Sequence, residues 1–384
     1  MTVTAPKGFR ASGVIAGLKP SGKPDVALVV NDGPSQVSAG RFTGNRVKAA
    51  PVKWTQQVIT YGRLKSVILN SGGANACTGP EGFQDTHATA EKVAAVLGCG
   101  AAEVAVCSTG LIGERLPMGK LLPAVDEAAA ALTETGGEAA ATAIMTTDSV
   151  AKNAVVTSPA GWTVGGIAKG AGMLAPGLAT MLVVLTTDAV IDAAQADAAL
   201  GTACRYSFDR LDSDGSMSTN DTVLLLASGA SGAEADADEF TAALTDLCKD
   251  LARQLLTDAE GSTKDIAITV SGAQTEDDAV EVARGVARDS LVKTAMFGCD
   301  PNWGRILAAV GCAKAPFDAD EVDVAVNGVW ICKAGAAGVS RDEVDLKGRD
   351  VAIDIELHNG PASATIWTND LSHDYVHENS AYST

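Results

Sequence analysis

Positive charge is scarce in this chain. Its 29 Lys and Arg residues are outnumbered by 47 Asp and Glu residues, and the formal net charge is −18. No run of basic residues interrupts this acidic balance. Phosphate backbones and anionic membrane surfaces would repel such a protein. We therefore expect neither nucleic acid nor a membrane among its partners.

Long hydrophobic runs are also missing. The sequence has no uninterrupted apolar stretch of about 18 residues, the minimum for a membrane-spanning helix, and its first residues contain no apolar signal core. The 46% hydrophobic content of the 384 residues is nevertheless ample for a large core. These features predict a cytoplasmic protein.

Motifs for disulfides, metals and nucleotides are absent as well. The eight cysteines form no Cys-x-x-Cys pair, so we interpret them as small buried hydrophobic residues. His373 and His377 have the spacing of a metal-binding pair, but no third ligand accompanies them. No glycine-rich nucleotide loop is present. We expect no metal and no cofactor.

Short runs rich in β-branched residues recur along the chain and predict strands. Helical patterns lie between them, so the fold class is α/β or α+β, which the sequence alone does not separate. The predicted strands are 26–30, 66–69, 103–107, 181–185, 223–226, 266–270, 322–326 and 351–357.

Three helical segments can be placed from their end signals and periodicity. The first, 86–97, follows Asp85 as its predicted N-cap and ends at Gly98. The second, 277–294, begins with acidic residues and has an apolar face. The alanine-rich segment 128–143 contains a Gly-Gly pair that is expected to divide it.

The most informative segment is 169–188, in which a loop rich in Gly and Pro leads to Thr180 at the start of an apolar strand. Small residues leave the Ala179–Thr180 peptide bond sterically open and permit strained backbone. Attack by the threonine hydroxyl on the preceding carbonyl, followed by hydrolysis, would cut the chain there. Thr180 would then carry a free α-amine, which titrates near about 8 and can serve as its own base. The alternative is that Thr180 merely begins a buried strand.

This segment resembles the self-cleavage site of the ornithine acetyltransferase family, whose pattern is Lys-Gly-x-Gly-Met-x-x-Pro-x-Met-Ala-Thr-Met-Leu. The chain departs from it at Leu178, where Met is usual, and at Gly177, where a polar residue is common. Neither departure affects the nucleophile. Further motifs follow in the family's order over nearly the whole chain, at 69–79, 108–113, 144–148, 214–222, 258–264, 287–295, 300–305, 368–372 and 378–384.

The resemblance implies a layered α–β–β–α arrangement, shared with related self-cleaving aminopeptidases. It also implies cleavage into segments 1–179 and 180–384, which interlock and assemble as a heterotetramer with two copies of each. The expected activity is the transfer of acetyl from N2-acetyl-L-ornithine to L-glutamate in the cyclic arginine pathway. The mechanism is expected to be ping-pong through an acetyl ester on Thr180.

Acyl transfer also needs donors for an oxyanion. Thr109 and Gly110 follow a predicted strand, and a hydroxyl and a backbone N–H can converge there on one oxygen. The alternative is an ordinary Ser-Thr-Gly turn, and the family resemblance favours the oxyanion hole.

The resemblance implies five further contacts with substrate, besides Thr180 itself. Thr146 and Lys169 flank the first half of the site, and Lys169 is suited to a substrate carboxylate. Glu260 is suited to the distal ammonium or to the Thr180 amine, while Asn379 and the carboxylate of Thr384 complete the site. The alternatives are a solvated surface lysine, a helix-end acid and a frayed terminus.

One alternative function is a self-cleaving aminopeptidase or amidase of related fold, with water as the acyl acceptor. A second is a protein that binds amino acids without catalysis. Some members of the family also use acetyl-CoA, and the absence of a separate CoA motif leaves that activity open. The turn 302–305 has no assigned role.

Overall fold

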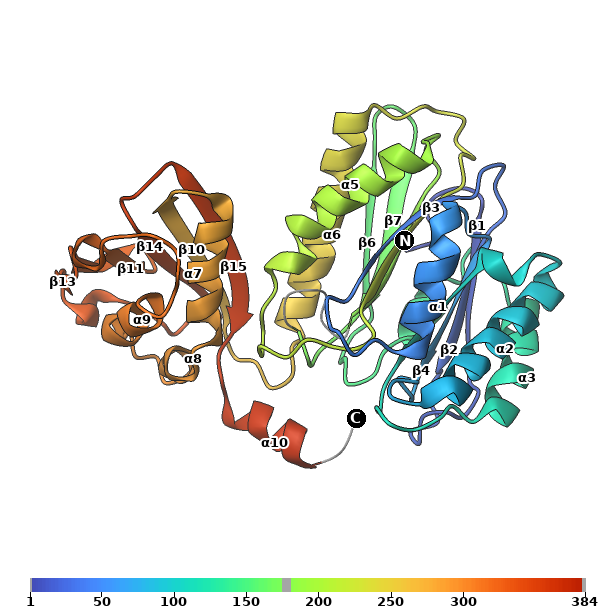
Figure 1. Cartoon of the computed structure of the whole chain (residues 1–384), viewed down its shortest axis with the longest axis horizontal. Helices are drawn as coiled ribbons and strands as arrows, with labels where there is room; N and C mark the ends of the chain where they lie inside the picture. Colours follow the sequence, from blue (N-terminus) through green and yellow to red (C-terminus); the bar gives the residue numbers. More distant parts are fainter. Residues whose placement is uncertain (1, 175–180, 382–384) are drawn as a thin grey trace. The chain divides into compact units, whose positions relative to one another are not determined.

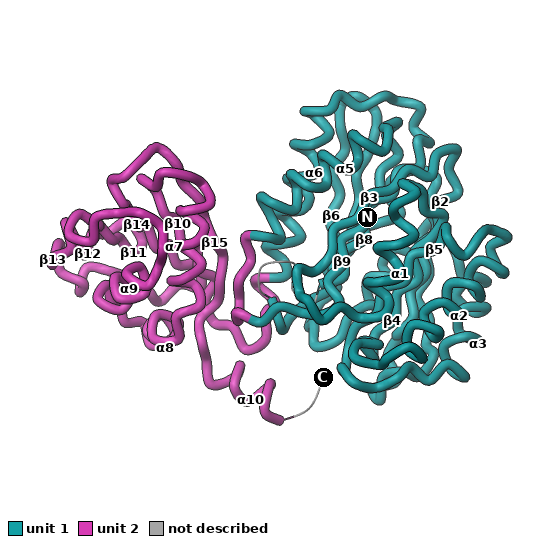
Figure 2. The backbone as a smooth tube through the Cα atoms, in the orientation of Figure 1, with its two compact units in different colours: residues 1–209, 216–255, 383–384 teal, residues 210–215, 256–382 magenta. Residues whose placement is uncertain are grey.

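The computed structural model describes residues 2–174 and 181–381. Within them the chain forms two compact units (Figure 2). Unit 1 contains the chain up to residue 209 together with 216–255, and unit 2 contains 210–215 and 256–381. Neither boundary coincides with the expected division at residues 179 and 180, which stays a prediction about chemistry.

Unit 1 contains a four-stranded sheet in the order β1-β2-β4-β5. Strands β1 and β4 both run antiparallel to β2, whereas β5 runs parallel to β4. Parallel strands end at the same edge of a sheet, so the residues after β4 and β5 are brought together there. The bounds are β1 Phe9–Val14, β2 Val26–Asn31, β4 Ser66–Ser71 and β5 Val104–Thr109.

The second sheet of unit 1 has five strands in the order β3-β9-β8-β7-β6. Every residue of β8 and β9 is buried, as the apolar runs in their sequences predict. Strands β3, β6 and β7 precede residue 179, whereas β8 and β9 follow residue 180, so the two segments interlock in one sheet. The bounds are β3 Val37–Phe42, β6 Lys152–Thr157, β7 Thr163–Lys169, β8 Leu182–Thr187 and β9 Thr222–Ala227.

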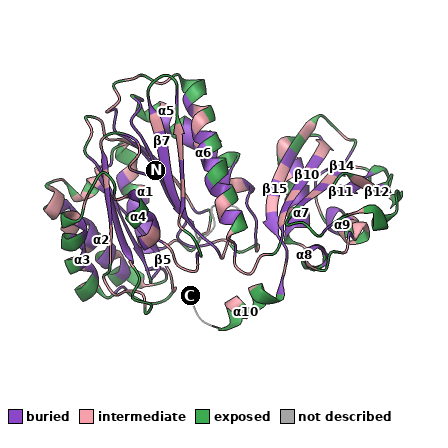
Figure 3. Cartoon of the chain, turned by 180° about the vertical axis from the view of Figure 1, so that it is seen from behind, coloured by how far each residue is buried: buried purple, intermediate pink, exposed green. Residues whose placement is uncertain are grey.

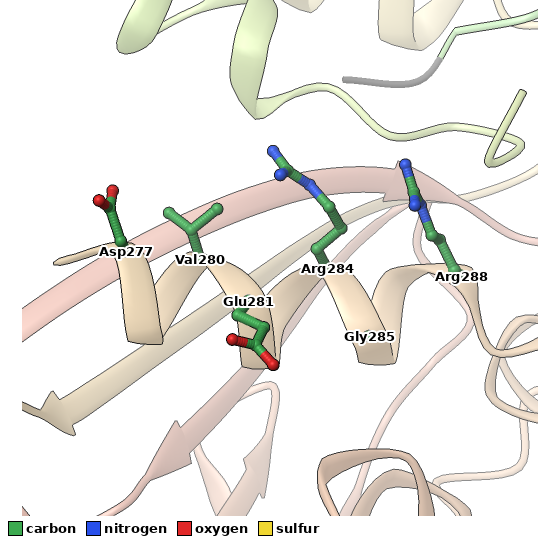
Figure 4. A pocket seen from close by; sticks show the side chains of 6 residues that line it. All are labelled: Asp277, Val280, Glu281, Arg284, Gly285 and Arg288. Carbon is green, nitrogen blue, oxygen red and sulfur yellow. The ribbon is translucent and has the colours of Figure 1, made fainter. Parts of the chain in front are cut away.

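Helices cover the outer faces of the two sheets of unit 1 (Figure 1). One hydrophobic core joins the sheets, since Val29 and Val106 of the first share it with Ile167 and Leu224 of the second. Helices α2 and α3 lie on one side and α5 and α6 on the other, with their outward faces exposed (Figure 3). The expected α–β–β–α layering is thereby confirmed. The helices are α1 Ala50–Val58, α2 Gly79–Leu97, α3 Met118–Ala130, α4 Gly137–Ala143, α5 Ala193–Arg205 and α6 Ala237–Thr257.

Unit 2 is built on a six-stranded sheet in the order β13-β12-β11-β14-β10-β15. Helix α7 packs against the sheet, and its buried side chains, such as Val282 and Val286, share a core with Ile268 and Ile353. The strands are β10 Asp265–Ala273, β11 Asp323–Val326, β12 Val329–Lys333, β13 Ala336–Ala337, β14 Asp350–Glu356 and β15 Ala362–Asn369. The helices are α7 Glu276–Arg288, α8 Ser290–Phe297, α9 Trp303–Val310 and α10 His373–Ala381.

Two of the predicted helix boundaries are wrong. Helix α2 begins at Gly79 rather than after Asp85, because Pro80 in the first turn starts the helix earlier. Asp85 lies inside α2 and accepts hydrogen bonds from Arg115 at 2.7 and 2.9 Å. The predicted helix 277–294 is divided into α7 and α8 at Asp289, whose extended backbone ends one helix and whose side chain caps the next.

Other predictions have mixed outcomes. The segment 128–143 is divided, and α4 begins at the Gly-Gly pair as expected, but α3 already ends at Ala130. The burial predicted for all cysteines is wrong for Cys77, Cys299 and Cys312, which are exposed, while Cys99 is half-buried. None of the helices within residues 2–174 and 181–381 is both long and apolar enough to cross a bilayer.

Candidate active site

The predicted oxyanion residues lie where β5 leaves the first sheet. The carbonyl oxygen of Thr109 accepts hydrogen bonds from the N–H groups of Gly72 and Gly73, each at 3.0 Å. Gly110 has a φ of +129°, and a Cβ atom added there would lie 2.5 Å from the Gly73 nitrogen. Only glycine therefore fits this position without a shift of the backbone.

Both predicted donors have the chemistry that an oxyanion requires. The N–H of Gly110 donates to no acceptor in the described part of the chain, and the Thr109 side chain is almost fully buried at 1% exposure. A hydroxyl and an unused N–H thus come from consecutive residues on one turn. Such a pair can stabilise the charge that develops on a tetrahedral oxygen.

Lys169 ends β7 and brings two of the predicted residues together. Its Nζ donates to Thr146 Oγ1 at 2.8 Å and lies 3.4 Å from Thr109 Oγ1. The lysine side chain is 1% exposed, so the alternative of a solvated surface lysine is wrong. The structure therefore gathers Thr109, Thr146 and Lys169 in one buried polar cluster.

Asp148 holds this cluster in place, and sequence reasoning did not single it out. Its carboxylate accepts from Lys152 Nζ at 2.6 Å and from the N–H groups of Gly170 and Thr146 at 2.7 and 2.9 Å. Lys169 Nζ lies 3.9 Å from the same carboxylate. The motif 144–148 contained the signal, because an acid two residues after Thr146 can accept a hydrogen bond from the Thr146 N–H.

Electrostatics keeps Asp148 ionised. Burial alone would raise the pKa of its carboxyl, but Lys169 and Lys152 lower that pKa to about 2. The side chains of Asp148 and Lys152 are both fully buried. A buried carboxylate between two cations fixes the position of both amines.

The sequence analysis assigned no role to Asn220 or Asp221, although both lie in the motif 214–222. The Asn220 Nδ2 donates to the carbonyl oxygens of Ala74 and Ser108 at 2.6 and 2.8 Å. These bonds tie the segment before β9 to the turn after β4 and to the end of β5. The Asp221 Oδ1 accepts from the Met181 N–H at 3.0 Å, and burial raises the pKa of this carboxyl well above its usual range. Asp221 thus anchors the residue directly after Thr180.

The expected cleavage site itself, Ala179 and Thr180, and the terminal residue Thr384 lie outside the described residues. The chain on either side of the cleavage site is nevertheless fixed in the sheet. In the register of β7 and β8, Lys169 pairs with Leu182, two positions after Thr180.

Unit 2 brings together the two remaining predicted residues. Asn379 on α10 donates through Nδ2 to Glu260 Oε2 at 3.0 Å. Glu260 and Asn379 are 119 positions apart in the sequence, so only the fold makes them neighbours. Neither is buried in the structure.

Other residues named from the sequence have structural assignments. Asn302 caps α9 by accepting from the Arg305 N–H at 3.2 Å, which explains the turn 302–305. His373 and His377 lie on α10, and the described residues contain no group of three or more potential metal ligands.

The layered sheets, the turn at Thr109 and Gly110 and the buried Lys169 form an arrangement that suits an α/β enzyme for acyl transfer. A family model for the ArgJ family matches residues 10–384. The chain belongs to the ArgJ family, which confirms the family resemblance and the prediction of an enzyme.

Several known proteins are similar to this chain. It is 62% identical to the arginine biosynthesis bifunctional protein ArgJ of Streptomyces coelicolor and 63% identical to that of Streptomyces avermitilis, in each case over the whole of both chains. A solved structure of ornithine acetyltransferase from Mycobacterium tuberculosis, complexed with ornithine, is 64% identical. The match covers 46% of this chain and 94% of that one, with a TM-score of 0.45.

Proposed function

We propose that this protein transfers the acetyl group of N2-acetyl-L-ornithine to L-glutamate, giving ornithine and N-acetylglutamate. The main support is the buried cluster of Thr109, Thr146 and Lys169. Lys169 pairs with Leu182 in the strand that follows Thr180. The family and the names of its relatives place the reaction in arginine biosynthesis.

The first step of the proposed reaction matures the enzyme. The Thr180 hydroxyl attacks the Ala179 carbonyl, and hydrolysis of the resulting ester frees the Thr180 amine. The two segments stay associated because β8 lies between β7 of the first segment and β9 of the second. Each buried apolar side chain of β8, from Leu182 to Leu185, stabilises this association by about 1.5–3 kcal/mol.

Acetyl transfer then proceeds by double displacement. The free amine of Thr180 takes the proton of its own hydroxyl as the oxygen attacks the acetyl carbon. The oxyanion receives hydrogen bonds from Thr109 Oγ1 and the Gly110 N–H, the amide C–N bond breaks, and ornithine leaves with a proton. The glutamate amine attacks the acetyl ester and restores Thr180.

We assign each substrate group to side chains of opposite charge or with hydrogen-bonding capacity. Lys169 and Thr146 are proposed to receive the α-carboxylate that both amino acids carry. Glu260, Asn379 and the Thr384 carboxylate are proposed to receive the ammonium end of ornithine. The enzyme requires no metal or added cofactor, acts in the cytoplasm, and assembles as a heterotetramer with two copies of each segment. Acetyl-CoA is proposed as a second acetyl donor, for net synthesis of N-acetylglutamate.

Steady-state kinetics test the transfer against hydrolysis. Double-reciprocal lines for acetylornithine at several glutamate concentrations should be parallel, and activity should rise with pH through the Thr180 amine pKa, near about 8. N-acetylglutamate should form in preference to free acetate. Acetate as the main product would instead identify an amidase, and intersecting lines would favour direct transfer between bound substrates.

Replacement of Thr109 by alanine should slow acetylation of the enzyme by about 10²–10³-fold, because one oxyanion donor is lost. Thr109→Ser keeps the hydroxyl and is expected to retain most of the rate. Single-turnover release of ornithine measures this step, and a thermal melt checks folding. An alanine variant as fast as the serine variant would remove Thr109 from the oxyanion site.

A further inference from the structure

A basic pocket in unit 1 plays no part in the proposed reaction. It has a volume of about 480 Å³ and lies beside the first turn of α2. Three cationic side chains line it, from Arg46, Lys48 and Lys53. Cys77, Thr78 and Gly79 contribute the wall at the start of the helix.

The charge of this basic pocket contrasts with the rest of the chain. Arg46, Lys48 and Lys53 form no ion pair with any described residue, although the chain as a whole carries a net charge of −18. Some other cations of unit 1 are paired, as Lys92 is with Asp126. No carboxylate lines the pocket. The pocket therefore gathers three cationic side chains with no acidic residue in its lining.

Glu81 is an acidic residue beside the pocket wall. It lies in the first turn of α2, and its Oε2 is 3.3 Å from the position that a Cβ atom on Gly79 would occupy. One exposed carboxylate opposes three cations, so the local charge stays positive.

The start of α2 adds backbone donors to the same wall. The Thr78 hydroxyl donates to Asn75 Oδ1 at 2.7 Å and does not cap the helix. The N–H groups of Gly79 and Glu81 have no acceptor among the described residues. A 19-residue helix presents a partial positive charge here, and free N–H groups at such a terminus bind phosphate well.

Backbone hydrogen bonds also link the basic pocket to the turn at Thr109 and Gly110. The Ala74 N–H donates to the Leu111 carbonyl at 3.0 Å, and the Gly113 N–H donates to the Ala76 carbonyl at 2.9 Å. Cys77 and Thr78 of the pocket wall come directly after Ala76. One hydrogen-bonded pair of loops thus carries both the pocket wall and Gly110.

We propose that this basic pocket binds the phosphoryl groups of a small phosphorylated ligand. Three cations with no ion-pair partner and two free N–H groups suit a di- or triphosphorylated anion better than a single carboxylate. The pocket wall and the turn at Thr109 and Gly110 belong to the same pair of hydrogen-bonded loops. This arrangement points to an acetyl donor whose tail is phosphorylated, such as a CoA thioester. That last assignment rests on the proposed function, whereas the binding of phosphoryl groups does not.

Calorimetric titration of the full-length protein with inorganic phosphate, pyrophosphate and CoA tests the proposal. The triple variant Arg46→Gln, Lys48→Gln, Lys53→Gln should weaken binding of the phosphorylated probes at least about tenfold. A control variant removes the same charge from exposed sites elsewhere in unit 1, at Arg63, Lys249 and Arg253, and should change binding by less than about twofold. Binding to the wild type should also weaken as salt is raised from about 50 to 300 mM.

The probes separate the two possible sources of the phosphoryl groups. Pocket-dependent binding of CoA alone assigns the site to the thioester, and equal binding of pyrophosphate and CoA assigns it to phosphoryl groups in general. Either result supports the proposal. Absence of binding by all three probes, or equal weakening by the control variant, would overturn it. The rate of transfer from acetylornithine to glutamate should stay within about twofold of the wild-type rate in both variants. Failure of the wild type to catalyse this transfer would count against the proposed function alone.

Discussion

Replacing Thr180 by alanine should leave the chain uncut and lower acetyl transfer by about 10⁵–10⁶-fold, as removal of a nucleophile does in other covalent enzymes. The alanine side chain has no hydroxyl to attack the Ala179 carbonyl. Without cleavage no free amine forms at residue 180, so both the nucleophile and its base are lost. A denaturing gel and the rate of N-acetylglutamate formation measure the two effects.

The matched control for this variant is Thr180→Ser, which keeps a hydroxyl at the same position. It should still be processed and should retain activity well above that of the alanine variant. Edman sequencing of the C-terminal segment of the wild type should begin at Thr-Met-Leu. Cleavage of the alanine variant at the same bond would show that Thr180 does not cut the chain.

Asp148→Asn should lower the free energy of unfolding by about 3–5 kcal/mol, because two buried ammonium groups would lose their carboxylate. Lys152 Nζ lies 2.6 Å from Asp148 and Lys169 Nζ lies 3.9 Å from it, and neither lysine can reach water without rearrangement. The control is Asp197→Asn, which breaks the exposed ion pair with Arg41 and should cost less than about 1 kcal/mol. Urea unfolding of both variants measures the difference.

The pH dependence of stability gives Asp148 a second test. Its pKa is about 2 in the folded chain and 3.8 for an unperturbed carboxyl. The folded pKa is the lower one, so this stabilisation is present above about pH 4 and is lost as the pH falls toward 2. The asparagine variant should therefore show a smaller loss of stability over that range than the wild type. Equal loss of stability in the two proteins over this pH range would show that the ionised Asp148 carboxylate does not provide this stabilisation.

The sequence predicted those strands and helix ends that depend on residues close together in the chain. The buried strands β8 and β9 follow from continuous apolar runs, and the start of α4 follows from Gly136 and Gly137. The break at Asp289 was missed because the apolar pattern runs on past it. Lys293 lies four residues after Asp289, the spacing of a helical ion pair, yet its amine donates to the Ser213 carbonyl in another segment.

The candidate site was predicted in part, for a similar reason. Motifs identified Thr109, Gly110, Thr146 and Lys169, because each carries chemistry that can be recognised in a short segment. Asn220 could not be assigned in this way, since its partners Ala74 and Ser108 are 146 and 112 positions away. Its role is to hold backbone loops together, and such a role depends on the fold rather than on the neighbouring sequence.

The central claim is that Thr180 accepts acetyl from N-acetylornithine once the chain has been cut. Intact mass spectrometry of the purified protein, incubated with N-acetylornithine and no glutamate, tests it most directly. We predict two segments, of which the one that begins at Thr180 gains the mass of a single acetyl group and loses it when glutamate is added. A single uncut chain, or two segments of which neither is acetylated while N-acetylglutamate still forms, would contradict the account.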